Sequence, residues 1–270
     1  MIEYGCNTVL FKKYSLDTAV ATLKKIGYDG IEISAIEGMC DHLNPDNKAE
    51  AAYVKAVMEK YGMKMLSCEA ATHDIERLKK IFAVSAEVGI PIVNIGPGGK
   101  MGDEDSLKES IETVGKIAEM ARSYGVTLCC KAHVGCSVFD TPTTIKLAEA
   151  LKGNPYFGID MDPSHIYRAG EAPENAIDSV VQYMKHVHIR DCVCVKDEDG
   201  DQILGGGPGH PFEQICGAGD INLKAYMDVL HKKGYGGPVC LEVIGPDLDL
   251  TDATIVAAKS LGYLQGITSR

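Results

Sequence analysis

The chain of 270 residues contains no tryptophan and no apolar run long enough to cross a membrane. A membrane-spanning helix needs roughly 20 consecutive apolar residues. The opening residues, Met1-Ile2-Glu3-Tyr4, also lack the basic flank and apolar core of a secretory signal. We therefore expect a cytoplasmic protein with no membrane partner.

Basic residues are too few for a nucleic-acid-binding protein. The chain has 27 Lys and Arg against 38 Asp and Glu, which gives a formal net charge of -11. Proteins that bind a phosphate backbone displace its counterions with Lys and Arg. The sequence therefore predicts no nucleic-acid partner.

Two common motifs are absent as well. No GxGxxG loop follows the first β-rich run, which excludes the usual dinucleotide fingerprint. The ten cysteines include no CxxC pair, and Cys192-Val193-Cys194 is a lone CxC. Disulfide frameworks belong to small secreted chains, whereas Cys68, Cys129 and other cysteines here fall inside apolar runs. We expect reduced core thiols and no structural zinc.

One unit recurs along the chain: an amphipathic helix, a glycine and a short β-rich run. In the first copy, apolar residues repeat at helical spacing from Leu16 to Ile26, Gly27 ends the helix, and Gly30 begins a strand. Eight such units in about 250 residues fit a closed barrel better than an open sheet. We predict a single (β/α)8 TIM barrel domain over residues 1–270, with strands at Ile2–Cys6, Gly30–Ile33, Lys64–Cys68, Pro91–Ile95, Val126–Cys130, Tyr156–Met161, His186–Arg190 and Val239–Val243.

Three predicted strands in the second half end in residue types that bind metals. One is followed by Asp162 and His165, the next contains His188, and the last reaches Glu242. The C-terminal ends of barrel strands meet on one face, so these side chains are expected to lie together. Two carboxylates and two imidazoles suit Mn, Mg, Co or Zn, and a buried hydrogen-bonded network without metal is the alternative. His186 by itself is expected to be an ordinary core residue.

Several motifs give the chain a resemblance to the xylose isomerase-like TIM barrels. They are GYDGIE at residues 27–32, DPSH at 162–165, HVHIRD at 186–191, GAGDIN at 217–222, GYGG at 234–237 and LEV at 241–243. This superfamily contains sugar isomerases and epimerases, inosose isomerases and dehydratases, and endonuclease IV. The resemblance implies the same barrel, with chemistry at its C-terminal face.

The resemblance also implies a metal site, with one departure. In the epimerase branch a divalent ion is bound by a Glu, an Asp, a His and a Glu after strands five to eight. Asp162, His188 and Glu242 match three of these positions, but Lys131 stands at the fourth. A protonated ammonium cannot bind a metal. We expect His133, two residues later, to be the fourth ligand of one divalent ion per chain. The alternatives are that Lys131 supplies the positive charge itself, or that the site is vestigial.

The same resemblance implies acid–base and substrate-binding roles for several residues. Glu242 matches the family's carboxylate base. Its acid–base partner is expected to be Lys131 with a lowered pKa, or His165; alternatively, Glu242 alone shuttles one proton in an aldose–ketose isomerisation. The remaining candidates are expected to contact substrate: Glu32, His73, Asn94 and Arg190, the last oriented by Asp191.

These residues predict a metal-dependent isomerase or epimerase that acts on a small keto sugar or cyclitol through an enediolate. The alternative is a lyase that dehydrates a keto-inositol or eliminates from a keto-glycoside. A non-enzymatic sugar-binding barrel and an endonuclease IV-like nuclease are less favoured. The long segment from Cys192 to Asn222 is expected to be a lid, a binding loop or a subunit contact, and homo-oligomerisation stays open.

Overall fold

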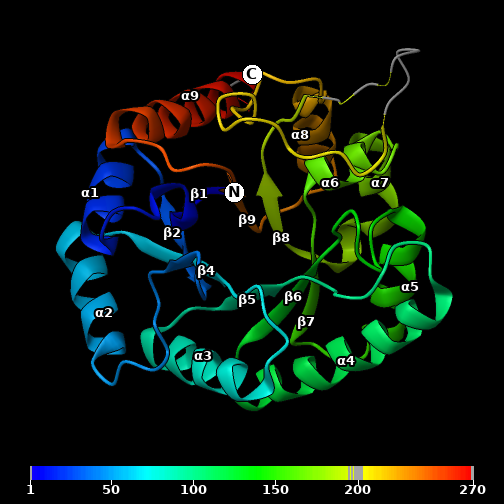
Figure 1. Ribbon diagram of the computed structural model, residues 1–270, viewed down its shortest axis with the longest axis horizontal. Helices are drawn as coiled ribbons and strands as arrows, with labels where there is room; N and C mark the ends of the chain where they lie inside the picture. The colour runs from blue at the N-terminus through cyan, green and yellow to red at the C-terminus, as the bar shows by residue number, and fades with distance from the viewer. Residues whose placement is uncertain (1, 194, 196, 198–202, 269–270) are drawn as a thin grey trace.

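A computed structural model of the chain describes residues 2–193, 195, 197 and 203–268. Its centre is a closed barrel of eight parallel strands, in which the last strand, β9, pairs with β1 and β1 pairs with β2. The predicted barrel is therefore confirmed (Figure 1). The barrel strands are β1 (Glu3–Asn7), β2 (Gly30–Ile36), β4 (Lys64–Glu69), β5 (Ile92–Ile95), β6 (Thr127–Lys131), β7 (Phe157–Asp160), β8 (Met184–Ile189) and β9 (Pro238–Leu241).

Helices form the outer ring around this barrel (Figure 1). They are α1 (Leu16–Ile26), α2 (Glu50–Tyr61), α3 (Ile75–Val88), α4 (Glu104–Ser123), α5 (Thr141–Leu151), α6 (Pro163–Arg168), α7 (Pro173–Val180), α8 (Leu223–Lys232) and α9 (Leu250–Thr268). The last helix contacts the first, which closes the ring. A short strand, β3 (Cys40–Asp41), adds an antiparallel ladder to the end of β2.

Local sequence signals set where these helices begin and end. Ser15 and Asp74 each accept a hydrogen bond from the backbone of the first turn of α1 and α3, which satisfies a free N–H group there. Gly27, after α1, has φ 108°, a left-handed conformation that glycine adopts without steric cost. These signals fix where α1 and α3 begin and where α1 ends, and so where the chain leaves α1 toward β2.

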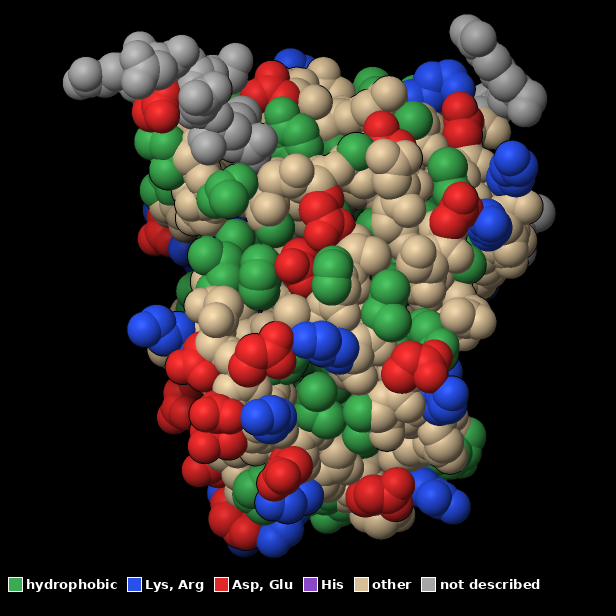
Figure 2. All heavy atoms as spheres, turned by 90° about the vertical axis from the view of Figure 1, so that its right-hand side faces the viewer, with side chains coloured by type: hydrophobic (Ala, Val, Ile, Leu, Met, Phe, Trp, Pro, Cys, Tyr) green, Lys and Arg blue, Asp and Glu red, His purple; other side chains and the backbone are tan. Residues whose placement is uncertain are grey.

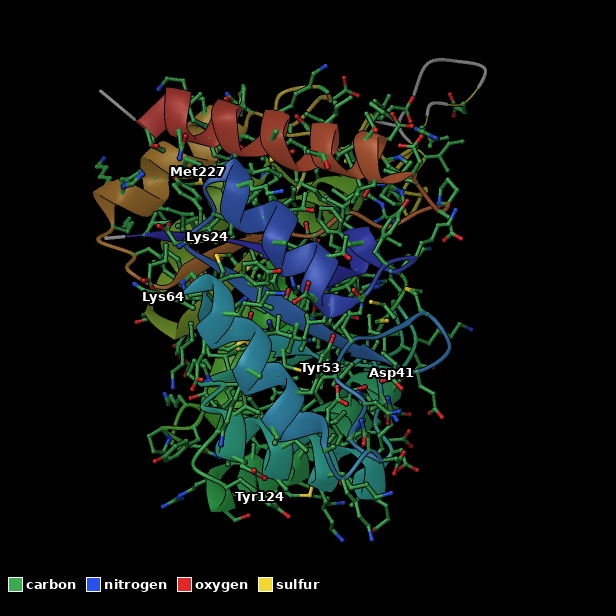
Figure 3. The ribbon with its side chains drawn as sticks, turned by 90° about the vertical axis from the view of Figure 1, so that its left-hand side faces the viewer. Lys24, Asp41, Tyr53, Lys64, Tyr124 and Met227 are labelled. Atoms are coloured by element: carbon green, nitrogen blue, oxygen red, sulfur yellow. The ribbon has the colours of Figure 1, made fainter. Side chains whose placement is uncertain are left out.

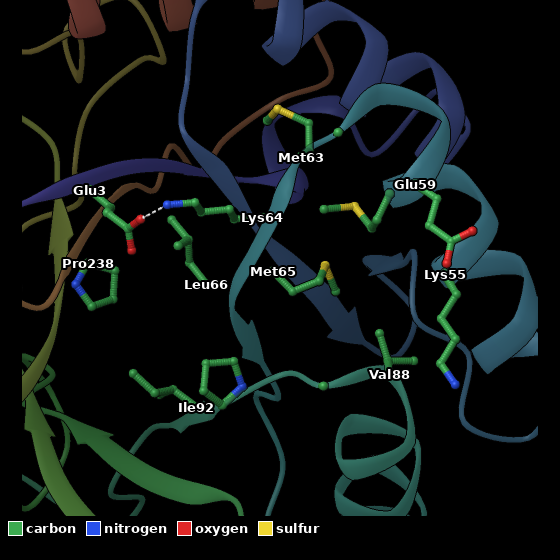
Figure 4. Close-up of a pocket in the computed structure, with 14 residues that line it drawn as sticks. Glu3, Lys55, Glu59, Met63, Lys64, Met65, Leu66, Val88, Ile92 and Pro238 are labelled. Carbon is green, nitrogen blue, oxygen red and sulfur yellow. Dashed lines mark hydrogen bonds and ion pairs between the residues drawn. The ribbon is translucent and has the colours of Figure 1, made fainter.

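The two ends of the barrel differ in chemistry. Lys64, which begins β4, and Asp41, in β3 at the end of β2, lie toward opposite sides of the molecule (Figure 3). At the end where the strands begin, a hollow of about 630 Å³ lies beside Met63, Met65 and Val88 (Figure 4). At the opposite end the strands finish in buried charged side chains.

The outer surface is charged, as the composition requires. Figure 2 shows acidic and basic side chains interspersed over one side of the molecule, with the acidic ones gathered most densely in its lower part. None of the helices formed by the described residues combines the length and the apolar character that a membrane crossing requires.

Close backbone approach inside the barrel depends on small residues. Gly5 in β1 and Gly30 in β2 are paired in register, and the side chain of Leu66 fills the space beside both. A Cβ atom on Gly30 would lie 2.6 Å from the backbone oxygen of Lys64. Real Cβ atoms essentially never come so close to backbone, so β2 or β4 would have to shift.

Replacing Gly30 with alanine is expected to destabilise the barrel by about 1–3 kcal/mol, the usual cost of overpacking a filled core. Urea unfolding followed by circular dichroism measures this change. Gly153→Ala is the control, because no heavy atom outside its chain neighbours lies within 4 Å of its added Cβ. Equal midpoints for the two variants would contradict the packing argument.

Candidate active site

The C-terminal half of the barrel interior is lined with buried polar side chains. Every barrel strand contributes at least one of them, either within the strand or directly after it. They are Asn7, Glu32, Ser67, Glu69, Asn94, Lys131, Asp160, His186, His188 and Glu242. Because burying an unpaired charge is costly, this interior is stable only if the charges are paired.

The deeper part of this interior is built around two histidines of β8. His188 lies between two carboxylates, with Nε2 2.5 Å from Glu32 Oε2 and Nδ1 2.5 Å from Asp160 Oδ2. His186 Nδ1 lies 2.9 Å from Asp160 Oδ1, and its Nε2 lies 2.8 Å from Ser67 Oγ. His186 is thus a satisfied core residue, in line with the sequence-based expectation.

This arrangement fixes the charges of the deep groups. Burial by itself would lower the pKa of His188, but Asp160 and Glu32 raise it well above the ordinary value, so the ring is protonated. Burial would likewise raise the pKa of Asp160, yet His188 and His186 hold it below its usual range. Glu32 accepts further hydrogen bonds from Asn7, Ser67 and Asn94. The deep layer is therefore a network of paired charges, joined by ion pairs and hydrogen bonds.

Above this layer, Lys131 joins two carboxylates. Its Nζ donates to Glu242 Oε1 at 2.7 Å and to Glu69 Oε1 at 3.0 Å. Burial opposes the charge of Lys131, but Glu242 and Glu69 raise its pKa above the ordinary value. The expectation of a lowered lysine pKa is therefore wrong, because the two carboxylates outweigh burial. Lys131 is a fixed cation and not a proton acceptor.

The two carboxylates bound to Lys131 differ from each other. Burial and the neighbouring Glu242 together raise the pKa of Glu69 to about 8, because Lys131 only partly offsets them. For Glu242, burial is overcome by Lys131, His188 and Arg190, and its pKa falls well below the ordinary value. At neutral pH one carboxyl is therefore protonated for much of the time and the other is ionised.

Arg190 links the strand ends of β7, β8 and β9. Its guanidinium lies 3.1 Å from Asp162 Oδ2 and 3.3 Å from Glu242 Oε2, and Nε donates to Ser164 Oγ at 2.8 Å. The expectation that Asp191 orients Arg190 is not met. Asp191 instead accepts hydrogen bonds from the backbone of the following loop, at Cys192, Gly217 and Ile221.

Two predicted histidines lie against each other on one wall. The rings of His133 and His165 have centroids 3.9 Å apart, and His165 Nε2 lies 3.0 Å from Arg190 Nη2. Burial, followed by Arg190 and His133, lowers the pKa of His165 well below the ordinary value. Burial and Lys131 also lower the pKa of His133. Both rings are therefore neutral at physiological pH.

A cavity of about 590 Å³ opens above these groups. Predicted site residues on its wall or floor are His73, Lys131, His133, His165, Arg190 and Glu242. Glu69 and Arg168 line it as well. Glu32 and Asn94 were predicted to contact substrate, but neither lines this cavity, since both lie in the deep layer. The segment from Cys192 to Asn222 contributes Pro208 to the rim; Cys194 of the CxC motif lies outside the described residues.

The four predicted metal ligands do not gather at one point. Asp162 and Glu242 share Arg190, whereas His188 lies below with Glu32 and Asp160. Among the described residues, three groups of side chains have donor atoms within 4.8 Å of one another and could hold a metal ion. These groups are Glu32, Glu69 and His188; Asp160, His186 and His188; and Glu32, His186 and Cys240.

Two buried site residues were missed in the sequence. The predicted third strand stopped at Cys68, whereas β4 continues to Glu69, so the carboxylate at its end was not recognised. Asp160 lies two residues before Asp162, and alternation along a strand places such residues on the same side. The strand-end argument would have found Glu69 had the end of β4 been known, and alternation from Asp162 would have pointed to Asp160.

Comparison with known proteins adds a family and several relatives. The model of the family described as "Xylose isomerase-like TIM barrel" matches residues 20–265. An inosose isomerase of Halalkalibacterium halodurans is 23% identical over 258 residues, which cover 83% of this chain and 81% of the relative. An inosose dehydratase of Clostridium perfringens is 26% identical over 171 residues, covering 62% of this chain and only 57% of the dehydratase.

Solved structures share the fold over nearly the whole chain. A crystal structure of IOLI protein with a bound zinc atom has a TM-score of 0.79 at 18% identity, covering 99% of this chain and 98% of that one. A D-psicose 3-epimerase from Clostridium cellulolyticum H10 has a TM-score of 0.77 at 14% identity, covering 98% and 99%. At these identities the likeness establishes the fold alone.

Replacing Asp160 with asparagine is expected to destabilise the protein by about 3 kcal/mol, because it leaves a protonated His188 with one buried counter-charge in place of two. Chemical denaturation at neutral pH measures the change. The surface variant Asp178→Asn, which removes only an exposed ion pair with Lys233, should leave the midpoint unchanged. If Asp160→Asn and Asp178→Asn had the same denaturation midpoint, the deep network would not be needed for stability.

Proposed function

Because this chain belongs to the xylose isomerase-like TIM barrel family, we propose that it is an isomerase or epimerase of a small keto sugar or cyclitol, acting through an enediolate. One observation carries the proposal. On the floor of an open cavity, an ionised Glu242 contacts two fixed cations, Lys131 and Arg190. The named activities of the relatives, on inososes and ketoses, support the substrate class.

In this proposal Glu242 removes the proton from the carbon beside the substrate carbonyl. The charge that develops on the carbonyl oxygen then lies beside Lys131 and Arg190, which are already held in place by their carboxylate partners. Cations that need no rearrangement during the reaction stabilise such an oxyanion efficiently. Burial of the site strengthens this interaction because little water screens it.

The cavity wall positions the substrate in this scheme. His165 is neutral and adjoins Arg190, so it is suited to exchange a hydrogen bond or a proton with a substrate hydroxyl. His73 Nε2–H donates to the backbone oxygen of Gly96, which leaves Nδ1 as an acceptor for the cavity. Glu32 and Asn94 act indirectly, by holding His188 and the deep layer in place.

We also propose one divalent ion per chain, supported by two buried carboxylate oxygens at the cavity floor. Asp162 Oδ2 and Glu242 Oε2 are buried and accept no hydrogen bond. Each forms an ion pair with Arg190. Asp162 and Glu242, with His133 beside them on the cavity wall, would hold the ion, whereas His188 is kept apart from them by Glu32 and Asp160. The ion would polarise the substrate carbonyl.

A second candidate is a lyase that removes water from a keto-inositol. The inosose dehydratase relatives and the Lys131-Ala132-His133 sequence at the end of β6 favour it. Elimination needs one base and one acid at the cavity; Glu242 could supply the base, and His165, neutral in this structure, would have to gain a proton to supply the acid. The two candidates share the first proton abstraction and differ in the product, which either keeps the mass of the substrate or lacks one water.

The variant Glu242→Gln tests the proton abstraction common to both candidates. Incubation of inosose, D-fructose and D-tagatose in D₂O, followed by NMR, measures exchange of the carbon-bound hydrogen and formation of product. Loss of the base should slow exchange by about 10²–10⁴-fold. Glu50→Gln is the control, since Glu50 is buried on α2 and bonds Asn44 and Asn47 away from the cavity. Native rates in Glu242→Gln would refute the proposed base.

Metal analysis of the native protein beside Lys131→Glu tests the ion. We expect about one divalent ion per chain in the native protein, with tighter retention during chelation in the variant, which restores a carboxylate near Glu242. Metal that appears only in Lys131→Glu would instead mean that Lys131 supplies the positive charge itself.

A further inference from the structure

Glu69 is a cavity carboxyl that the proposed function has not used. It ends β4, its Oε1 accepts from Lys131 Nζ at 3.0 Å, and its Oε2 accepts from Asn7 Nδ2 at 2.7 Å. Unlike Glu32 and Asp160, it lines the open cavity. Its side chain is 8% exposed, whereas those two are fully buried.

Glu69 and Glu242 are bound to the same ammonium. Lys131 Nζ contacts Oε1 of each, so the two carboxyls lie close together on the floor of the cavity. Both are held from behind, Glu69 by Asn7 and Glu242 by Arg190. A substrate that enters from the open side therefore meets the two carboxyls on one of its faces.

We propose that Glu69 is a second catalytic residue, which exchanges a proton with the substrate oxygens while Glu242 exchanges one with the carbons. This inference rests on the proposed function, because it needs a substrate that is deprotonated beside its carbonyl. It goes further in naming the acid that works with Glu242 and in restricting the outcome of the reaction.

The steps balance without any external reagent. Glu242 takes the proton from the carbon beside the carbonyl, and the electron pair of that C–H bond forms the carbon–carbon double bond. The carbonyl oxygen takes a proton from the carboxyl of Glu69, which gives an enediol. Glu69 then removes the proton from the neighbouring hydroxyl, a carbonyl forms there, and Glu242 returns its proton to the former carbonyl carbon. Both carboxyls regain their starting states.

Because both carboxyls act on one face, the reaction should move the carbonyl and not invert a centre. Inversion requires a proton to leave from one face and another to arrive on the opposite face. A shift of the carbonyl between adjacent carbons needs only one carbon base and one oxygen acid on the same side. The arrangement therefore favours isomerisation over epimerisation within the proposed class.

The variant Glu69→Gln separates the two roles. In D₂O with inosose, D-fructose and D-tagatose, we expect product formation to fall by about 10²-fold, the usual contribution of a general acid. Exchange of the carbon-bound hydrogen should fall much less, because Glu242, Lys131 and Arg190 remain. The ratio of exchange to product should therefore rise at least about tenfold, which a merely structural role would not cause. Glu50→Gln should keep the native ratio.

Three results would overturn the inference. The first is a Glu69→Gln variant whose exchange and product formation are both native or fall by the same factor. The second is a product epimeric with the substrate at the exchanging carbon. The third is a native protein that neither exchanges nor converts any of these compounds, which would overturn the proposed function as well. Should Glu69→Gln not fold, Glu69→Asp, which keeps the acid but shortens it, must give the same raised ratio.

Discussion

The pairing of buried charges at the C-terminal end of the barrel is the constraint on which this structure depends. Carboxylates and histidines there are almost wholly removed from water, and an unpaired charge in such a place costs several kcal/mol. Each is therefore matched: His188 lies between Glu32 and Asp160, Lys131 between Glu69 and Glu242. Every strand must then end in register, because a displaced strand would leave a partner unpaired.

This pairing divides the interior into two layers with different tasks. The deep layer, centred on His188, is joined across the barrel by hydrogen bonds and ion pairs, which hold the strand ends at fixed distances. The upper layer, centred on Lys131, borders an open cavity. The charges of the upper layer are consequently fixed before a substrate arrives, which is the condition under which they can stabilise a developing negative charge.

The fold and most of the cavity residues could be predicted because strand ends obey simple geometry. Repeated segments of helix, glycine and strand predicted a barrel. Residues at the C-terminal ends of its strands then lie on one face, where Lys131, His165, Arg190 and Glu242 line the cavity. Glu69 escaped because β4 runs one residue beyond the apolar run that marked it. The lowered pKa expected for Lys131 failed for a related reason: a sequence shows that lysine is buried, but not that two carboxylates face it.

The sequence alone determined the alternation of strands and helices, the family and the residue types at the strand ends, since these follow from periodicity and local motifs. Only the tertiary structure decided the partners. Lys131 and Glu242 are 111 residues apart, and His188 and Glu32 are 156 apart. Barrel closure brings them within hydrogen-bond distance, and the charge of each group depends on that distance. The protonation states, and the proton transfers proposed from them, are therefore properties of the closed barrel.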